Sequence, residues 1–112
     1  MAIWWVTPTE CIAALMRRQR EGTAAVGEVQ AIQVDLERLL SSALEMEPVQ
    51  QVRLTAQRLQ ANHPLRAADA LQLAAALVWA EQQPSGREFV SLDRRLRDAA
   101  QREGLTVLPH RL

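Results

Sequence analysis

Asp69 is the residue whose surroundings in the sequence point most clearly to chemistry. It lies in a largely apolar run, with Leu65 four residues before it and Leu73 four residues after it, so a helix would place all three on one face. Burying a carboxylate without a partner is costly, and buried charges are normally paired or bound to metal. Two interpretations follow: Asp69 binds a metal ion, or it forms an ion pair with Arg66 one helical turn earlier.

Asp93 and Glu10 each follow a short segment that is expected to form a strand. Asp93 comes directly after the segment 88–92, and Glu10 comes a few residues after the segment 3–6. In open α/β sheets, ligands bind beyond the carboxyl ends of the strands, which is where both side chains fall. Each residue also has a structural alternative, because Asp is a good N-cap and Glu10 is placed to close a capping box with Thr7.

The three carboxylates are expected to converge although they lie far apart in the chain. Helices that cover a parallel sheet begin at the edge where its strands end, so Glu10, Asp69 and Asp93 would share one rim. A group of carboxylates without cysteine or a well-placed histidine suits a hard cation such as Mg²⁺ or Mn²⁺. Such a cation activates water and neutralises charge on a phosphodiester. The sequence therefore indicates a divalent-metal site.

Alternating helices and strands are expected to position these residues. The predicted helices cover residues 7–20, 23–40, 48–62, 65–82 and 93–103, and the predicted strands cover residues 3–6, 44–47, 88–92 and 106–108. This order predicts an α/β fold with a mostly parallel sheet, in one domain over residues 1–112. The helix at 65–82 is apolar on nearly all sides after Asp69, so we expect it to be buried.

Composition sets limits on function and location. The formal net charge is zero, with 13 basic and 13 acidic side chains, which argues against a nonspecific basic nucleic-acid wrapper but allows a local basic rim. Every basic residue is Arg, whose planar fork suits phosphate, although codon bias explains the same pattern. A lone cysteine, the absence of a signal segment and the absence of a membrane-spanning run predict a cytoplasmic protein.

Several segments resemble motifs of the PIN-domain family, which includes the VapC-like toxins of type II toxin–antitoxin systems. Residues 65–74 (LRAADALQLA) resemble the family's central-helix motif, and residues 89–96 (FVSLDRRL) resemble its later strand–Asp–helix motif. Residues 104–108 resemble the closing strand, and residues 6–10 with the helix after them resemble the segment that bears a conserved Glu. The resemblance covers nearly the whole chain and implies a three-layer α/β/α fold.

The resemblance implies a Mg²⁺-dependent endoribonuclease and assigns roles to this chain's residues. Asp69 and Asp93 would be metal ligands, and Glu10 would be a third ligand or orient the metal-bound water. Ser91 would support the site by hydrogen bonding. The implied partners are an RNA substrate, an antitoxin from a neighbouring gene and a second copy of the chain in a homodimer.

The basic and aromatic side chains also have structural interpretations that need no function. Arg94 and Arg95 are candidates for phosphate contact, or they form a solvated helix face. The two histidines match no motif position and are expected at the surface, namely His63 and His110. The three tryptophans are expected in the core or at a partner contact, namely Trp4, Trp5 and Trp79.

The chain departs from the family pattern at its N-terminus. PIN domains begin with a central strand that ends in an Asp, and nothing before Glu10 is acidic here. We expect this strand to be missing, which would remove one metal ligand and impair cleavage. A start codon placed too far downstream, a decayed gene, and a strand supplied by a dimer or partner each explain the difference.

Two other functions stay open on the sequence alone. The apolar stripe over residues 26–40 suits a noncatalytic interaction module that keeps a PIN scaffold to bind a partner. An unrelated small α/β protein is the remaining alternative, in which the three acidic residues are only helix caps and an ion-pair partner.

Overall fold

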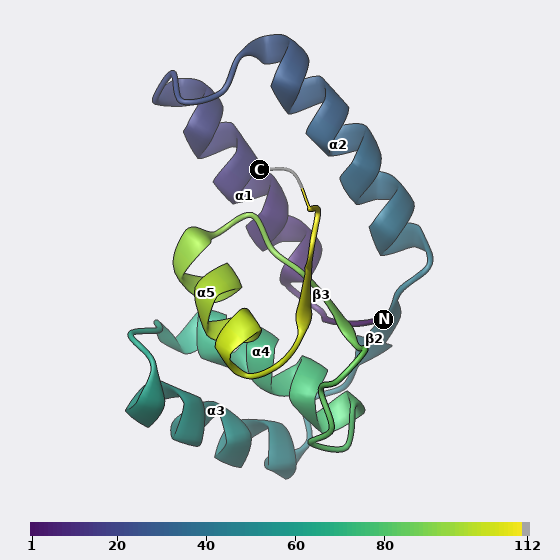
Figure 1. The fold of residues 1–112 in the computed structure, drawn as a ribbon, viewed down its shortest axis with the longest axis vertical. Helices are drawn as coiled ribbons and strands as arrows, with labels where there is room; N and C mark the ends of the chain where they lie inside the picture. The colour runs from purple at the N-terminus through teal and green to yellow at the C-terminus, as the bar shows by residue number, and fades with distance from the viewer. Residues whose placement is uncertain (111–112) are drawn as a thin grey trace.

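The computed structural model describes residues 1–110, in which five helices alternate with four short strands (Figure 1). In chain order the elements are β1 (Ala2–Trp4), α1 (Thr7–Arg20), α2 (Val26–Ser41), β2 (Leu44–Met46), α3 (Gln50–Asn62), α4 (Ala67–Trp79), β3 (Glu88–Val90), α5 (Arg94–Arg102) and β4 (Thr106–Leu108). The order of elements agrees with the sequence prediction, and the fold is mixed α/β with parallel strands. No helix in this part of the chain combines the length and apolar character needed to cross a bilayer.

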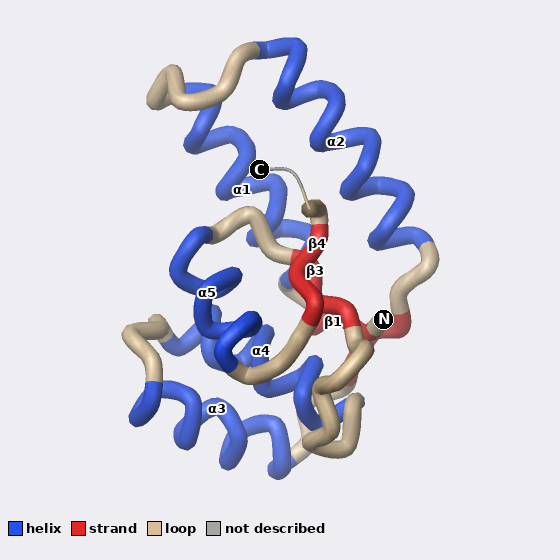
Figure 2. Tube along the Cα trace, in the orientation of Figure 1, coloured by secondary structure: helices blue, strands red, loops and turns tan. Residues whose placement is uncertain are grey.

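The strands form two parallel pairs rather than the single sheet that the sequence predicted. β1 pairs with β2 and β3 pairs with β4, with Ile3 opposite Glu45 and Phe89 opposite Val107. Figure 2 shows β1, β3 and β4 in the middle of the molecule. β1 and β3 approach each other, but no ladder hydrogen bonds join them within residues 1–110.

A hydrogen bond within the N-terminal segment, from Trp4 to Thr7, helps to explain why β1 does not extend the sheet toward β3. The Met1 carbonyl accepts from the Leu44 amide of β2, and successive residues of a strand point their backbone groups to alternate sides. The Trp4 amide therefore points away from β2. That amide donates instead to Thr7 Oγ1 at 3.0 Å. Each strand has only three residues, so losing one donor removes much of the edge available for pairing.

Helices cover both faces of the β3–β4 pair. Phe89 and Val107 point into a core cluster formed with α3, α4 and α5. Their neighbours Val90 and Leu108 point the other way, into a second cluster formed with α1 and α2. This alternation is the two-residue period of a strand buried on both sides. Figure 1 shows the two helix groups on opposite sides of the strands.

The central helix is shorter than predicted, although its burial is as expected. Residues 70–77 of α4 are buried apart from Leu71, which is half-buried. The prediction of a helix over 65–82 was too long at both ends. Arg66 is extended at the N-cap, and Glu81 and Gln82 have φ angles of 55° and 61°, which an α-helix does not accept. Helices α2 and α3 likewise start later than predicted, after extended N-cap residues.

The prediction that His63 lies at the surface was wrong. Its side chain is 7% exposed, and its Nε2 lies 2.7 Å from Glu103 Oε2. Arg58 binds the same carboxylate at 3.1 Å. This cluster ties the end of α3 to the end of α5, a contact between residues about forty positions apart that no local pattern signals. His110 is exposed, as predicted.

The tryptophans occupy three different environments. Trp4 is half-buried against the core cluster of α3, α4 and α5. Trp79 is half-buried, and the Arg87 guanidinium lies 5.0 Å from its ring centre. Trp5 is 72% exposed, so it is not a core residue. The core interpretation therefore holds in part for two of them and is wrong for Trp5.

Candidate active site

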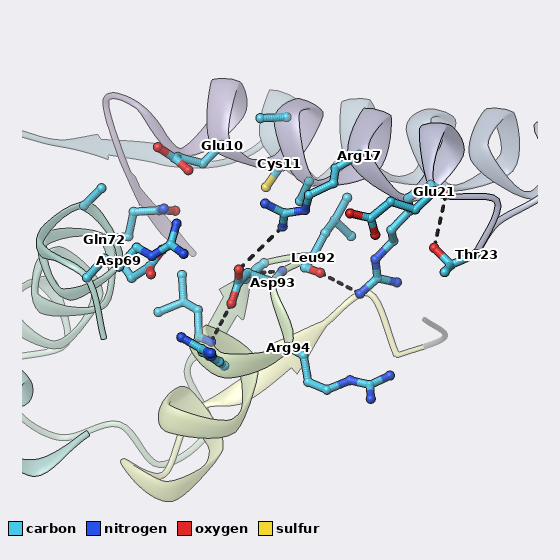
Figure 3. Close-up of a pocket in the computed structure, with 18 residues that line it drawn as sticks. Glu10, Cys11, Arg17, Glu21, Thr23, Asp69, Gln72, Leu92, Asp93 and Arg94 are labelled. Carbon is cyan, nitrogen blue, oxygen red and sulfur yellow. Dashed lines mark hydrogen bonds and ion pairs between the residues drawn. The ribbon is translucent and has the colours of Figure 1, made fainter. Parts of the chain in front are cut away.

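Glu10, Asp69 and Asp93 line one cleft of about 690 Å³ (Figure 3). Glu10 lies in the first turn of α1, Asp69 in the first turn of α4, and Asp93 is the N-cap of α5. Three segments that are distant in sequence therefore bring their helix N-termini to one place. Negative charge is favourable at such ends because their free backbone amides carry partial positive charge.

Asp69 is half-buried and has no ion pair with Arg66 within the part of the chain that the structure describes. Burial raises the pKa of Asp69, and the nearby charges of Asp93 and Glu10 raise it further. The backbone and guanidinium of Arg66 oppose this rise without cancelling it. The carboxylates are thus close enough to repel one another, and a cation among them would relieve that repulsion.

Asp93 uses its two carboxylate oxygens differently. Oδ1 accepts a hydrogen bond from the Leu96 amide at 3.1 Å, so the N-cap interpretation is correct. Oδ2 faces Arg17, whose Nη2 lies 3.7 Å away. The backbone amide of Asp93 donates to Ser91 Oγ at 3.1 Å. Ser91 is buried and fixes the backbone from which Asp93 projects into the cleft.

Glu10 is not part of a capping box, so that sequence prediction was wrong. Val6 is the N-cap of α1, and no side chain caps the helix. Thr7 Oγ1 accepts from the Trp4 amide instead. The Glu10 carboxylate has no hydrogen bond or ion pair with any other side chain in residues 1–110. Figure 3 shows it above Asp69 on the other side of the cleft.

Sequence reasoning missed Gln72 and the full role of the α1 arginines. Gln72 is 3% exposed and lines the cleft one turn after Asp69, and residues 1–110 supply no hydrogen bond to its amide. Arg17 and Arg18 line the same cleft from α1. Helical spacing would have found them, because Gln72 is three residues from Asp69 and Arg17 is seven residues from Glu10.

Arginines surround the carboxylates, so the cleft carries both signs of charge. Arg94 and Arg95 line it from the start of α5, and both are exposed. Their exposure agrees with the solvated helix face expected from the sequence, and contact with phosphate stays a prediction. The cleft therefore has carboxylates and guanidiniums among its lining groups.

The carboxylates are not arranged as a ready-made metal cage. Within residues 1–110, no three side chains of the His, Cys, Asp or Glu type are close enough together to grip one ion. Mg²⁺ is commonly held by one or two carboxylates with several waters, and the open cleft leaves room for those waters. The oxygen-only acidic set and the raised pKa of Asp69 fit such an ion.

Cys11 lines the cleft but is not poised for chemistry. Burial, followed by the charge of Glu10, raises the pKa of its thiol to about 12. A thiol with that pKa stays protonated at neutral pH and is a poor nucleophile. Cys11 therefore belongs to the packing of α1, as predicted from its apolar surroundings.

No family model matches the chain, and neither a curated protein nor a solved structure gives a significant match. The resemblance to PIN domains therefore rests on the residue pattern alone.

Proposed function

We propose that this protein is a Mg²⁺-dependent endoribonuclease with a PIN-like three-layer fold, acting as the toxin of a toxin–antitoxin pair. The observation that carries the proposal is the meeting of Glu10, Asp69 and Asp93, from three separate helix N-termini, in one cleft. Their mutual repulsion at Asp69 favours occupation by a cation. Mn²⁺ would serve in place of Mg²⁺ because both prefer oxygen ligands.

Each residue of the cleft would have its own role in phosphodiester hydrolysis. Asp69 and Asp93 would hold the divalent cation, which supplies charge neutralisation at the scissile phosphate and lowers the pKa of water. Glu10 would complete the ligand set or orient the attacking water. Ser91 holds Asp93 through its backbone, and Arg94 and Arg95 would steer RNA phosphates toward the acidic centre.

Metal binding and RNA cleavage test this proposal together. We expect wild-type protein to bind Mn²⁺ in calorimetry and to cleave labelled single-stranded RNA, and Asp69→Asn with Asp93→Asn to abolish both. Glu37→Gln is the matched control, since this exposed carboxylate of α2 lies outside the cleft. Wild-type protein that binds no divalent ion, or a double variant that cleaves as well as wild type, would contradict the proposal.

A noncatalytic interaction module is the second candidate, and one observation favours it. Helix α2 packs against α1 through Val29 and Leu36, while Val26 and Val34 on the same helix are exposed. An antitoxin segment or a second copy of this chain is the proposed partner. In that case the double variant of Asp69 and Asp93 would keep its partner, whereas Val26→Ser with Val34→Ser would lose it.

A further inference from the structure

A smaller hollow of about 160 Å³ lies beside the acidic cleft. It is lined by three arginines and two other polar residues, namely Arg18, Arg94, Arg97, Asp98 and Gln101. Arg18 and Arg94 also line the main cleft, so the two depressions share a wall. Figure 3 shows Arg94 turned away from Glu10 and Asp69. The site thus has an acidic centre and a separate basic end.

Two of the three arginines are held in place by backbone carbonyls. Arg18 Nη2 donates to the Leu92 carbonyl at 2.8 Å. Arg97 donates from Nη1 to the Ser91 carbonyl and from Nη2 to the Pro109 carbonyl, each at 2.8 Å. A guanidinium has five N–H donors, so each keeps donors for a ligand after these bonds are made. Fixing the side chains in advance lowers the entropy cost of binding an anion.

The hollow has an excess of positive charge among the described residues that line it, 1–110. Burial lowers the pKa of Arg97, and the charge of Arg18 lowers it further, with Asp98 opposing. Burial lowers the pKa of Arg18 in the same way, followed by the charges of Arg94 and Arg17, with Asp93 opposing. Among residues 1–110, Asp98 is the one carboxylate that lines the hollow, against three guanidiniums. An anion placed among them would relieve this repulsion.

We propose that Arg18, Arg94 and Arg97 form a phosphate subsite that holds a neighbouring phosphodiester of the RNA strand whose scissile phosphate lies at the carboxylates. The subsite rests on the proposed nuclease function for its substrate, but its anion binding needs no metal. The planar, forked guanidinium group matches the oxygens of a phosphate group. Three guanidiniums around one hollow favour an oxyanion over a neutral ligand. The strand would run from the acidic centre to the basic end.

The test measures RNA binding by the full-length chain without metal. Anisotropy of a short fluorescein-labelled single-stranded RNA in EDTA would be followed over a range of salt concentrations. We expect Arg94→Gln and Arg97→Lys each to weaken affinity by roughly three- to tenfold, and Arg94→Gln to lower the salt slope by about 0.7. Arg102→Gln is the matched control, because this exposed arginine of α5 lines neither depression.

The possible outcomes distinguish a failure of the phosphate subsite from a failure of the proposed metal site. Equal affinity and salt slope for Arg94→Gln and Arg102→Gln would overturn the subsite, whatever the metal does. Inorganic phosphate should compete with the RNA better than chloride of equal ionic strength, and equal competition would contradict the subsite. Binding of inorganic phosphate with no RNA binding would overturn it in favour of a free-phosphate site. Loss of Mn²⁺ binding with an intact subsite would contradict only the nuclease proposal. Circular dichroism of Arg97→Lys establishes that the variant is folded.

Discussion

Arg17 Nη2 lies 3.7 Å from Asp93 Oδ2, so this protein places one of its own cations beside a carboxylate that we propose as a metal ligand. The two elements that carry these residues, α1 and the start of α5, both line the cleft. The Arg17 guanidinium attracts the Asp93 carboxylate and would repel an incoming divalent ion. Arginine and metal therefore compete for the same oxygen.

Removing the Arg17 charge is expected to strengthen metal binding. Arg17→Gln should tighten Mn²⁺ binding by roughly two- to fivefold, since half-exposed ion pairs contribute only about 0.2–1 kcal/mol. Calorimetric titration with Mn²⁺ would measure the change. Arg20→Gln, in the same helical turn but outside the cleft, should leave the affinity as it is in wild type. Weaker Mn²⁺ binding by Arg17→Gln would show that Arg17 supports the metal site.

Asp69 is expected to make stability depend on pH. Burial and the neighbouring carboxylates raise its pKa, so the folded protein holds this proton more tightly than the unfolded chain does. The ionised Asp69 carboxylate therefore lowers the stability of the folded state. This loss of stability develops as the pH rises from the pKa of Asp69 in the unfolded chain through its pKa in the folded protein. Asp69→Asn should raise Tm at neutral pH, and the difference should vanish below pH about 3.8, the unperturbed value. Thermal melts across this range would measure it.

The effect of Mn²⁺ on Tm is a second test of the Asp69 carboxylate. Mn²⁺ should raise the Tm of wild type, because a ligand that binds only the folded state stabilises it, and should leave Asp69→Asn unchanged. Identical melting curves for wild type and Asp69→Asn at every pH, with and without Mn²⁺, would show that Asp69 is not a metal ligand.

The element order and the convergence of the acidic residues follow from signals that lie close together in the chain. Apolar spacing marks α4 as buried, and the strand-to-helix turn at Asp93 marks both its cap and its place at the end of β3. Helix starts on one side of parallel strands then bring Glu10 and Asp69 to the same rim. These inferences need only local periodicity and the geometry of parallel strands.

The features that the sequence did not predict depend on contacts between distant segments. The division into two strand pairs involves the Trp4 amide, which Thr7 captures although the same threonine reads as a helix cap. The burial of His63 requires α5 to end beside α3, which no local pattern encodes. Arg18 reaches the Leu92 carbonyl across the cleft, a bond that exists only after α1 has docked on β3.

The Glu103 cluster is expected to stabilise the fold away from the cleft. Burial alone would raise the pKa of Glu103, but hydrogen bonds from Arg58 and His63 outweigh it and leave the pKa below 4.5. A lowered pKa contributes stability above the unfolded value, and this is lost as pH falls through the folded value. Glu103→Gln should cost about 2 kcal/mol at neutral pH in urea unfolding and less in acid. Glu47→Gln, an exposed control, should cost little at any pH.

Gln72 is expected to serve ligand binding rather than stability. Gln72 is 3% exposed as a residue, and its amide lines the cleft without a hydrogen bond to residues 1–110, where a ligand or water can reach it. Gln72→Met keeps the volume and breaks no hydrogen bond within residues 1–110, so urea unfolding should show little change in stability. RNA or Mn²⁺ affinity should fall by about fivefold, the equivalent of one lost hydrogen bond. Gln57→Met on the exposed face of α3 is the matched control. A loss of stability with unchanged affinity would mean that the amide supports the packing of α4, whereas the expected pair of results would make Gln72 a ligand-binding residue of the cleft.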